Sequence, residues 1–457
     1  MLTATTGFYP RTGGDTGDSV MRSTARRGAA GILAMCGLLA GLTACADRTA
    51  SASHFTTDEN PAEVGGTLRF MTPGYPTTPD GKAALKKVVD TFHRTYPKVR
   101  VETDLASWAH LNEKVTTSIA AGDLPDVMVT GVGWIPPFAS KGAFADLGSF
   151  GLTPKTLAER VRPGFVEPAV YDGKVYGVPS IGGAKVIAYR KSVFAAAGLD
   201  PDKPPTDLAE LRAYAKKLTV RKNGRLERSG FDFWVNPTQH QYTQNFATFL
   251  KAAGGSFYDS RGRAAFDSPA GVRALEAMDG LMNSDRAQDF ATASGDGSPM
   301  VLSGRAAMGF MGAYVDCDNK TGVGEKVCDD LGFFNITDKE QAMFMGGQIA
   351  SISSRTELPG AAYQLLKVLT SPEAEADLAK LNLAIPAART AEGSAVETSN
   401  PASEFAGRNT AHSAYSGGAD NWLQLQDEFA PALDEALLRR RTPRQALDTL
   451  AGKAGSM

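Results

Sequence analysis

The sequence predicts an α/β protein with two lobes, each containing a mainly parallel sheet flanked by helices. Strand-like and helix-like segments alternate from residue 66 onward, and the same alternation restarts near residue 186. About four hundred residues follow the N-terminal leader described below, which is more than a single hydrophobic core usually serves. Two lobes are therefore expected, one after the other along the chain.

The first lobe is expected to open with a short strand that ends at the turn-forming Pro73 and Gly74. An amphipathic helix follows, and Pro97 stops it. A second strand, a helix capped by Gly122 and a buried apolar strand continue the series. The predicted elements are a strand over 66–71, a helix over 83–96, a strand over 99–103, a helix over 111–121 and a strand over 125–130.

The second lobe is expected to begin with a strand over 186–189 and to continue with three helices. These helices are predicted over 208–218, 241–253 and 268–282. Ligands of open α/β sheets lie beyond the carboxyl ends of the strands, so two such lobes facing one another would enclose a cleft. We expect the functional site in that cleft.

The N-terminal segment has the pattern of an export signal. Basic residues over 22–27 precede an uncharged, apolar stretch over 28–42, which is too short to span a bilayer comfortably. The run Leu42-Thr43-Ala44-Cys45 then resembles the bacterial lipobox, in which the cysteine thiol takes up diacylglycerol. The alternative is a buried amphipathic helix that ends in cysteine, although the stretch shows no helical stripe.

We expect the signal peptide to occupy residues 1–44, with Met21 as the true start because the acidic residues before it do not suit a signal. Residues 45–65 would form a lipidated flexible tether on the extracytoplasmic face of the cell membrane. The general secretory route and twin-arginine export are both open.

Composition excludes several classes of partner. The 48 basic and 50 acidic residues give a net charge of −2 and are interspersed, so no nucleic acid or membrane surface held by charge is expected. No second apolar run approaches spanning length. We expect a soluble, monomeric body that is attached to the membrane through its lipid anchor only.

Two cysteines remain once Cys36 leaves with the leader and Cys45 carries lipid. Cys317 and Cys328 are expected to form a disulfide, because export places them in an oxidising compartment. The alternative is a metal site, for which two cysteines without a nearby histidine are a poor ligand set. We expect neither a metal nor a cofactor.

Motifs for catalysis are missing from the sequence. It contains no His-Glu-x-x-His, no Gly-x-Ser-x-Gly and no completed Gly-x-Gly-x-x-Gly, and its five histidines are scattered. The carboxylate pairs of glycoside hydrolases are defined by distance in space, so a secreted carbohydrate-active enzyme stays an alternative. We expect a protein that is not an enzyme and has no catalytic residues.

Short segments along residues 66–390 resemble, in order, those of the bacterial extracellular solute-binding protein family 1, the maltose-binding-protein-like group of ABC-transporter sugar-binding lipoproteins. Four of these segments are Ile119-Ala120-Ala121-Gly122-Asp123-Leu124-Pro125-Asp126-Val127, Tyr171-Asp172-Gly173-Lys174-Val175-Tyr176-Gly177-Val178-Pro179, Ser303-Gly304-Arg305-Ala306-Ala307-Met308 and Leu369-Thr370-Ser371-Pro372-Glu373. The resemblance implies a two-lobed periplasmic-binding-protein-like fold of type II. Lobe 1 would comprise 66–179 and 347–390, and lobe 2 would comprise 180–346 and 391–457, with a hinge between them.

The resemblance also implies that the protein captures a mono- or oligosaccharide in the cleft and delivers it to the transmembrane subunits of an ABC permease. A non-sugar solute, or a sensor system in place of the permease, is the alternative. Gly182 and Gly183 stand where maltose-binding protein has an acidic residue, which opens space for a bulkier ligand. We expect the nearby Lys185 to be a solvated surface residue.

Aromatic platforms and amides near strand ends are the candidate ligand contacts, because sugars offer apolar ring faces and hydroxyl edges. In the first lobe the candidates are Tyr75 after the first strand and Trp134 in a glycine-rich loop. Packing in the core is the alternative for Trp134. Gly347 and Gln348 are further candidates, since the glycines before Gln348 let a ligand approach the backbone.

The candidates in the second lobe come from two segments. Tyr242, Gln244 and Asn245 begin a predicted helix at positions where relatives contact sugar. Tyr314 stands where the family commonly has a stacking tryptophan, and it is expected to face Trp134 across the cleft. Asp316 follows it and could accept hydrogen bonds from hydroxyls, with a structural role in the disulfide loop as the alternative.

Overall fold

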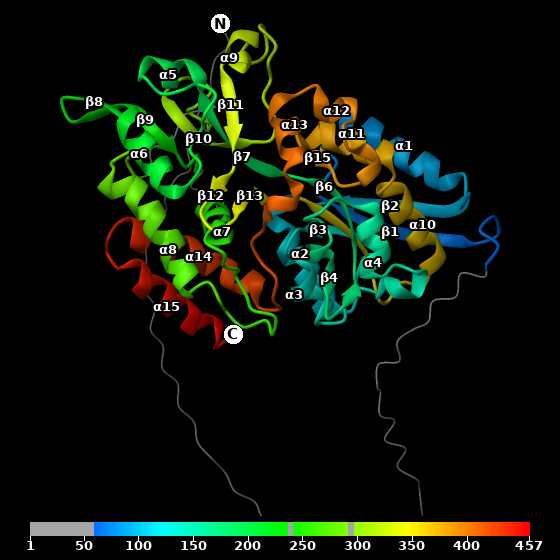
Figure 1. The fold of residues 1–457 in the computed structure, drawn as a ribbon. Helices are drawn as coiled ribbons and strands as arrows, with labels where there is room; N and C mark the ends of the chain where they lie inside the picture. Colours follow the sequence, from blue (N-terminus) through cyan, green and yellow to red (C-terminus); the bar gives the residue numbers. More distant parts are fainter. Residues whose placement is uncertain (1–58, 236–240, 291–296) are drawn as a thin grey trace, which may run out of the picture. The chain divides into compact units, whose positions relative to one another are not determined.

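The computed structural model describes residues 59–235, 241–290 and 297–457. Figure 1 shows two β-sheets with helices packed around them. The predicted leader over 1–44, Met21, Cys45 and most of the tether lie outside the described residues.

The first sheet is assembled from strands that are far apart in the sequence. They are β1 (Gly65–Thr72), β2 (Lys98–Leu105), β3 (Val127–Gly131), β6 (Val178–Gly182), β14 (Gln348–Ile352) and β15 (Ile385–Pro386). Their order is β15-β6-β14-β3-β1-β2. β1 is parallel to β2 and β3, whereas β14 runs antiparallel to β3 and β6, and β15 antiparallel to β6.

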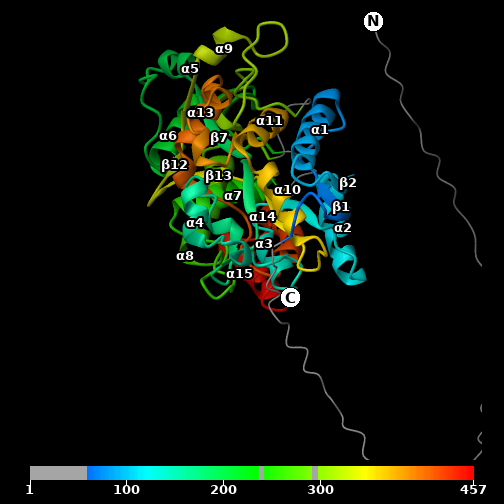
Figure 2. The ribbon, with the colours of Figure 1, turned by 90° about the vertical axis from the view of Figure 1, so that its right-hand side faces the viewer.

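Six helices of the described residues accompany this sheet. They are α1 (Pro79–His93), α2 (Trp108–Ala121), α3 (Ile135–Ala139), α4 (Pro154–Arg160), α10 (Pro359–Leu369) and α11 (Pro372–Asn382), with a small hairpin of β4 (Val170–Tyr171) and β5 (Lys174–Val175). Thr78 caps α1, because its hydroxyl accepts from the Gly81 amide, and a proline occupies the first turn. α1 packs against α10 and α11 (Figure 2).

The second sheet is mostly antiparallel. Its strands are β7 (Ala184–Arg190), β8 (Val220–Lys222), β9 (Arg225–Asp232), β10 (Ala306–Gly312), β11 (Leu331–Phe334), β12 (Ile336–Thr337), β13 (Gln341–Met345) and β16 (Ser413–Ala414). The order is β12-β13-β7-β10-β9-β8, with β11 on β7 and β16 on β13. The parallel pairs are β9 with β10 and β13 with β16. The expectation of mainly parallel sheets is therefore wrong, because strand periodicity carries no information about strand direction.

A helical layer with an aromatic core accompanies the second sheet. Its helices are α5 (Lys191–Ala196), α6 (Leu208–Leu218), α7 (Gln241–Ala252), α8 (Pro269–Asp279), α9 (Glu325–Asp329), α14 (Trp422–Leu437) and α15 (Pro443–Ala454), whereas α12 (Ala395–Thr398) and α13 (Pro401–Arg408) lie on a connection between the two sheets. Phe429 of α14 meets Phe246 of α7 and Phe266 at centroid distances of 6.2 and 4.8 Å. Within the described ranges, we find no helix that combines the length and the apolar character needed to cross a membrane.

Glycines allow the chain to pass between the two sheets. Gly183 joins β6 to β7, and Gly346 with Gly347 joins β13 to β14. The Gly183 amide donates to the Gly346 carbonyl at 3.3 Å, and the Gly346 amide donates back at 2.9 Å. Gly347 has a φ of 141°, and a Cβ there would lie 2.2 Å from the carbonyl oxygen of Ile181, so no other residue fits.

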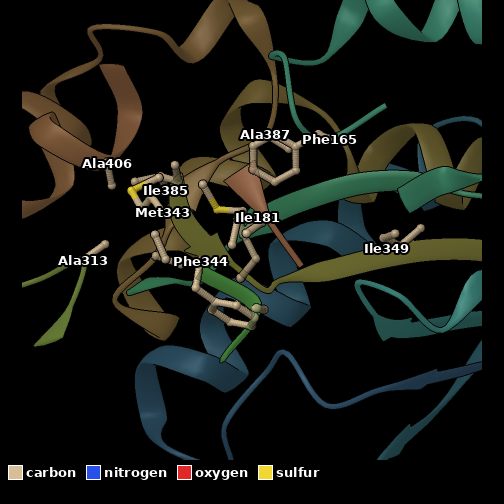
Figure 3. Packing of buried hydrophobic residues seen from close by; sticks show 14 of the residues in the cluster. Phe165, Ile181, Ala313, Met343, Phe344, Ile349, Ile385, Ala387 and Ala406 are labelled. Atoms are coloured by element: carbon tan, nitrogen blue, oxygen red, sulfur yellow. The ribbon is translucent and has the colours of Figure 1, made fainter. Parts of the chain in front are cut away.

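Buried side chains from both sheets surround this crossing. Figure 3 shows Ile181, Met343, Phe344 and Ile385 among them. A third connection leaves β15, passes through α12 and α13 and reaches β16 beside β13.

Candidate functional site

Strand ends of the second sheet bring distant residues to one edge beside the crossing. Lys185, at the start of β7, pairs with Gly312, at the end of β10. Gly309 of β10 pairs with Asp232, the last residue of β9. The carboxyl ends of β9 and β10 therefore lie at the edge where the chain enters β7, which is where open α/β sheets hold ligands.

Tyr75, Gly347 and Gln348 lie together at the matching edge of the first sheet. Tyr75 follows β1, and Gln348 begins β14 opposite Gly131 at the end of β3. Gln348 and Tyr75 are only 2% and 3% exposed. The Gly74 backbone packs on the Gln348 side chain, and its carbonyl accepts from Asn382 Nδ2 at 2.9 Å. These candidates are thus in place at the edge but are largely covered.

Trp134 both packs against neighbours and keeps part of its surface exposed. Its ring meets the rings of Trp108 and Phe138 edge to face, at centroid distances of 6.2 and 6.3 Å. The indole also lies against Gly131, where an added Cβ would be 3.3 Å from the ring. Packing against neighbours, the alternative role for Trp134, therefore accounts for only part of its surface, because the residue is half-buried.

Lys185 is buried, so the expectation of a solvated lysine is wrong. It is 5% exposed, and its Nζ donates to Asn245 Oδ1 at 3.1 Å. The ammonium lies 5.1 Å from the ring centroid of Trp234 and 5.7 Å from that of Phe310. Burial lowers the pKa of Lys185 to about 7, although the charge of Asp232 opposes the shift.

Asn245 is engaged inside the protein. Its Oδ1 accepts from Lys185, and its Nδ2 donates to the Phe233 carbonyl at 2.8 Å. The side chain is fully buried. This arrangement suits a residue that orients its neighbours more than one that contacts a ligand directly.

Trp234 is an aromatic residue at the same edge that was not predicted from the sequence. It follows β9 with a φ of 44°, a left-handed conformation that is a genuine outlier for a bulky side chain. Its amide donates to Asp232 Oδ1 at 2.9 Å, and its Nε1 donates to the Gly297 carbonyl at 2.8 Å. The segment Phe231-Asp232-Phe233-Trp234-Val235, in which aromatic and β-branched residues surround a single aspartate, is the signal that could have located both β9 and this residue. Strained residues of this kind cluster at ligand sites.

Tyr314 presents its ring at the end of β10 and is 39% exposed. The next residue, Val315, is held at both backbone groups by the Asn400 side chain, at 3.3 and 2.6 Å. On α7, Tyr242 stacks on Phe290 at 6.0 Å, and Gln244 is half-buried. Tyr314 therefore offers an accessible platform on a fixed segment.

Asp316 is committed to the loop that follows. Its carboxylate accepts from the Asp318 amide at 3.0 Å and from Thr321 Oγ1 at 2.9 Å. The predicted disulfide between Cys317 and Cys328 is present and closes this loop. These contacts favour the structural alternative for Asp316.

A pocket of about 540 Å³ lies next to Gly133, beside Trp134, and is lined by segments that are far apart in the sequence. The Tyr415 hydroxyl donates to Glu167 Oε1 at 3.0 Å, and Tyr171 and Asp420 also line the space. The backbones of Gly133 and Ser416 touch beside it, since a Cβ on Gly133 would lie 2.1 Å from the Ser416 carbonyl oxygen. No pattern in the sequence pointed to these residues, which belong to separate segments.

A larger cavity of about 680 Å³ lies elsewhere, between β2 and α2. Charged side chains such as Glu102, Asp104 and Lys114 line it, and Lys114 is paired with Asp104. It is a poorer candidate for a sugar site than the strand-end edges, because Phe70, the one phenylalanine, tyrosine or tryptophan among the described residues that line it, is buried. Within the described ranges, no group of three or more histidines, cysteines and carboxylates has an arrangement that suits a metal ion.

Comparisons with known proteins agree with this architecture. Residues 75–376 match the model of a family described as bacterial extracellular solute-binding protein. An uncharacterized lipoprotein from the oleD 5′ region of Streptomyces antibioticus is 35% identical over 161 residues, which are 35% of this chain and 35% of the relative. The diacetylchitobiose binding protein DasA of Streptomyces coelicolor is 25% identical over 304 residues, which are 63% of this chain and 66% of that protein. The alignment with the first of these relatives thus spans about a third of its length.

Solved structures share the fold. The cyclic alpha-maltosyl-1,6-maltose binding protein of Arthrobacter globiformis superposes with a TM-score of 0.68 at 23% identity, over 86% of this chain and 97% of that one. The predicted fold class, a two-lobed periplasmic-binding-protein-like α/β fold, is therefore confirmed, with mixed sheets.

Proposed function

Because the chain belongs to the bacterial extracellular solute-binding protein family, we propose that it captures a carbohydrate between two lobes and delivers it to the transmembrane subunits of an ABC permease. Members of this family are binding proteins, and we propose no catalytic role. The observation that carries the proposal is the pair of strand-end edges, with aromatic and amide side chains on both sides of a double-glycine crossing. The names of DasA and of the Arthrobacter globiformis protein, which specify oligosaccharides, support the ligand class.

The proposed lobes are 66–179 with 347–390, and 180–346 with 391–457. Their support is that the chain leaves the first sheet after Gly182 and returns to it at Gln348. Gly183 and Gly346 hold each other through two backbone hydrogen bonds, so the crossing can bend as a unit while side chains on either sheet stay packed. Closure of such a hinge on a ligand would present the lobes to the permease.

Trp134 and Tyr314 are the proposed stacking platforms on opposite sides of the cleft, and Trp234 is added as a third. Both tyrosine and tryptophan offer a large apolar face to a sugar ring. This assignment is supported by the position of the three residues just after strands of the two sheets. For Tyr314 it is also supported by the exposure of the ring.

The remaining candidates have different proposed roles. Tyr242, Gln244, Gly347 and Gln348 would line the cleft from α7 and from the start of β14. Tyr75 would pack beneath the residues that line the cleft at the edge of the first sheet, because its own side chain is buried.

Lipidation at Cys45 is part of the proposal, since a carbohydrate receptor for an importer must stay near the membrane. Cys45→Ala should leave an unlipidated precursor, because only the thiol can carry diacylglycerol. Metabolic labelling with a fatty acid tests this, and a labelled Cys45→Ala variant of mature size would refute it. We further propose that the protein acts as a monomer.

A thermal-shift screen tests the ligand class. The panel comprises maltose, maltotriose, mannobiose and diacetylchitobiose, with an amino-acid mixture and a polyamine as non-sugar arms. A saccharide at a hundred times its Kd stabilises the folded state by about 2.7 kcal/mol and raises Tm. Stabilisation by the amino acids or the polyamine, with no response to any saccharide, would overturn the ligand class and leave the fold untouched.

A further inference from the structure

Lys185 is a buried cation that is held by neutral groups. Its ammonium contacts the Asn245 amide oxygen from α7 and lies over the rings of Trp234 and Phe310. Asp232, at the end of β9, acts on it by charge from a distance. That carboxylate is engaged with the amides of Trp234 and Met300, at 2.9 and 3.0 Å. Among the described residues, Lys185 therefore has no ion pair.

This arrangement weakens the folded state. Moving an ammonium from water into an apolar site disfavours its charged form, and one amide oxygen does not replace its hydration. A methionine at this position would fill similar space without that loss. A buried, unpaired charge that a protein retains beside a strand-end edge points to a function.

Of the two rings beside the Lys185 ammonium, that of Trp234 is the nearer. The indole is anchored at Nε1 by the Gly297 carbonyl, and its backbone is strained in the left-handed region. The ammonium, 5.1 Å from the ring centroid, attracts the ring face and opposes rotation of the side chain. Asn245 fixes the ammonium in turn, so α7, β7 and the segment after β9 form one chain of contacts.

We propose that Lys185 is a positioning residue of the ligand site, which holds the Trp234 indole in the orientation that meets the ligand, and that ligand affinity falls when its ammonium loses a proton. The ligand part of this inference rests on the proposed function. Burial lowers the pKa of Lys185 to about 7, so we expect the positive charge that attracts the indole to be present below neutral pH and to be lost above it. Asp232 is the charged group facing this cluster, whereas α7 contributes the neutral Asn245 and β10 the apolar Phe310.

Tryptophan fluorescence tests the coupling without any ligand. We expect the wild-type emission to change with a midpoint near pH 7, and the step to be lost in Lys185→Met and in Trp234→Phe. Lys217→Met, which alters an exposed lysine on α6, should keep the step. A wild-type titration with no step near neutrality, or a step that survives in both Lys185→Met and Trp234→Phe, would overturn the inference. If Lys185→Met fails to fold, Trp234→Phe still decides the origin of the step.

Calorimetric titration with maltose, mannobiose and diacetylchitobiose tests the effect on binding. Affinity of the wild type should be about threefold to tenfold higher near pH 6 than near pH 8.5, which matches loss of a partly desolvated cation–π contact. Lys185→Met should bind weakly at both pH values, whereas Lys217→Met should follow the wild type. A saccharide that binds with pH-independent affinity would overturn the positioning role while leaving the proposed function intact. If no saccharide binds, the proposed function and the predicted effect of Lys185 on ligand affinity fail together. The fluorescence titration then tests only whether Lys185 and Trp234 are coupled.

Discussion

Two buried cations, Arg162 and Lys185, are held in opposite ways. The Arg162 guanidinium is 1% exposed and donates to both oxygens of Glu397, at 3.0 and 2.6 Å, and to the Ala388 carbonyl at 3.4 Å. Lys185 has an amide oxygen and two aromatic rings instead. The first charge is matched by a bidentate carboxylate, and the second is not.

The difference separates a structural role from a functional one. Arg162 and Glu397 tie the segment after α4 to α12, on the connection that leaves the first sheet for the second. The Glu397 carboxylate also fills the space above Gly407 of α13, where a Cβ would lie 1.3 Å from Oε1. Lys185 joins no such network and instead faces an aromatic residue at a strand end. The matched buried ion pair thus stabilises the third connection, which runs from β15 to β16, and the unmatched buried cation lies at the strand-end edge that we propose binds the ligand.

Breaking the matched pair should have the largest effect. Glu397→Ala leaves the Arg162 charge buried without a carboxylate, and we expect the free energy of unfolding to fall by about 3 to 5 kcal/mol. Urea denaturation measures this loss. The control is Glu404→Ala, which removes an exposed pair with Arg408 and should cost about 0.5 kcal/mol or less. Equal losses in the two variants would show that the Arg162 pair is no stronger than a surface pair.

Removing the unmatched cation should stabilise the protein. The pKa of Lys185 is about 7 when folded against 10.5 for an ordinary lysine, so between these values the unfolded chain binds more protons. Stability of the wild type therefore rises as pH increases from about 7 to 10.5. Lys185→Met lacks this titration and should be more stable by about 2 to 4 kcal/mol below pH 7, with the margin shrinking toward pH 10.5. A less stable Lys185→Met at pH 6 would mean that the lysine is structural.

The buried carboxyl group of Glu375 extends the comparison from buried cations to a buried acid. Glu375 lies close to Arg162, accepts from the Ala388 amide at 2.8 Å, and has a pKa raised by burial to about 8. Between its ordinary value of 4.5 and about 8 the folded state binds more protons, so stability falls as pH rises through this window. Glu375→Gln keeps an acceptor for the amide and should be more stable by about 1 to 3 kcal/mol near pH 8.5, with no difference near pH 4.5. Thermal melts across this range measure the difference, and parallel pH profiles for the two proteins would contradict it.

Aromatic platforms should affect binding while changing stability least. Tyr314→Ala removes an exposed ring, so saccharide affinity should fall by about 1 to 3 kcal/mol with Tm unchanged. Trp134→Ala should weaken binding similarly but also lower Tm, because its ring packs on Trp108 and Phe138. Calorimetry with the saccharide from the screen measures both, with Leu438→Ala as an exposed apolar control between α14 and α15. Unchanged affinity in both aromatic variants would remove this site assignment.

The position of most elements could be predicted from sequence, but not their direction in the sheets. The helix expected over 208–218 is α6 (Leu208–Leu218), and the strand expected over 66–71 lies within β1 (Gly65–Thr72). Apolar periodicity and caps are local, so they locate these elements well. β14 returns antiparallel beside β3 only because the chain has crossed to the second sheet and back, and no local pattern records that path.

Site residues divide in the same way. Trp134 follows a strand that the apolar pattern predicted, whereas Tyr314 was located only through the family resemblance, because β10 was not predicted. Lys185 is held by a hydrogen bond to Asn245, which is 60 positions away on α7, so the sequence around Lys185 did not indicate that it is buried. Trp234 was not identified as a candidate because β9 was not predicted. Its strained conformation can be seen only in the backbone angles.

A carbohydrate bound between the strand-end edges of the two sheets is the arrangement on which the proposed function depends. A crystal structure of the protein with the saccharide that raises Tm most would show whether it exists. We expect a sugar ring in contact with Tyr314 or Trp234 from the second sheet and with Trp134 from the first. A saccharide bound instead in the cavity between β2 and α2, with the strand-end edges unoccupied, would refute this arrangement.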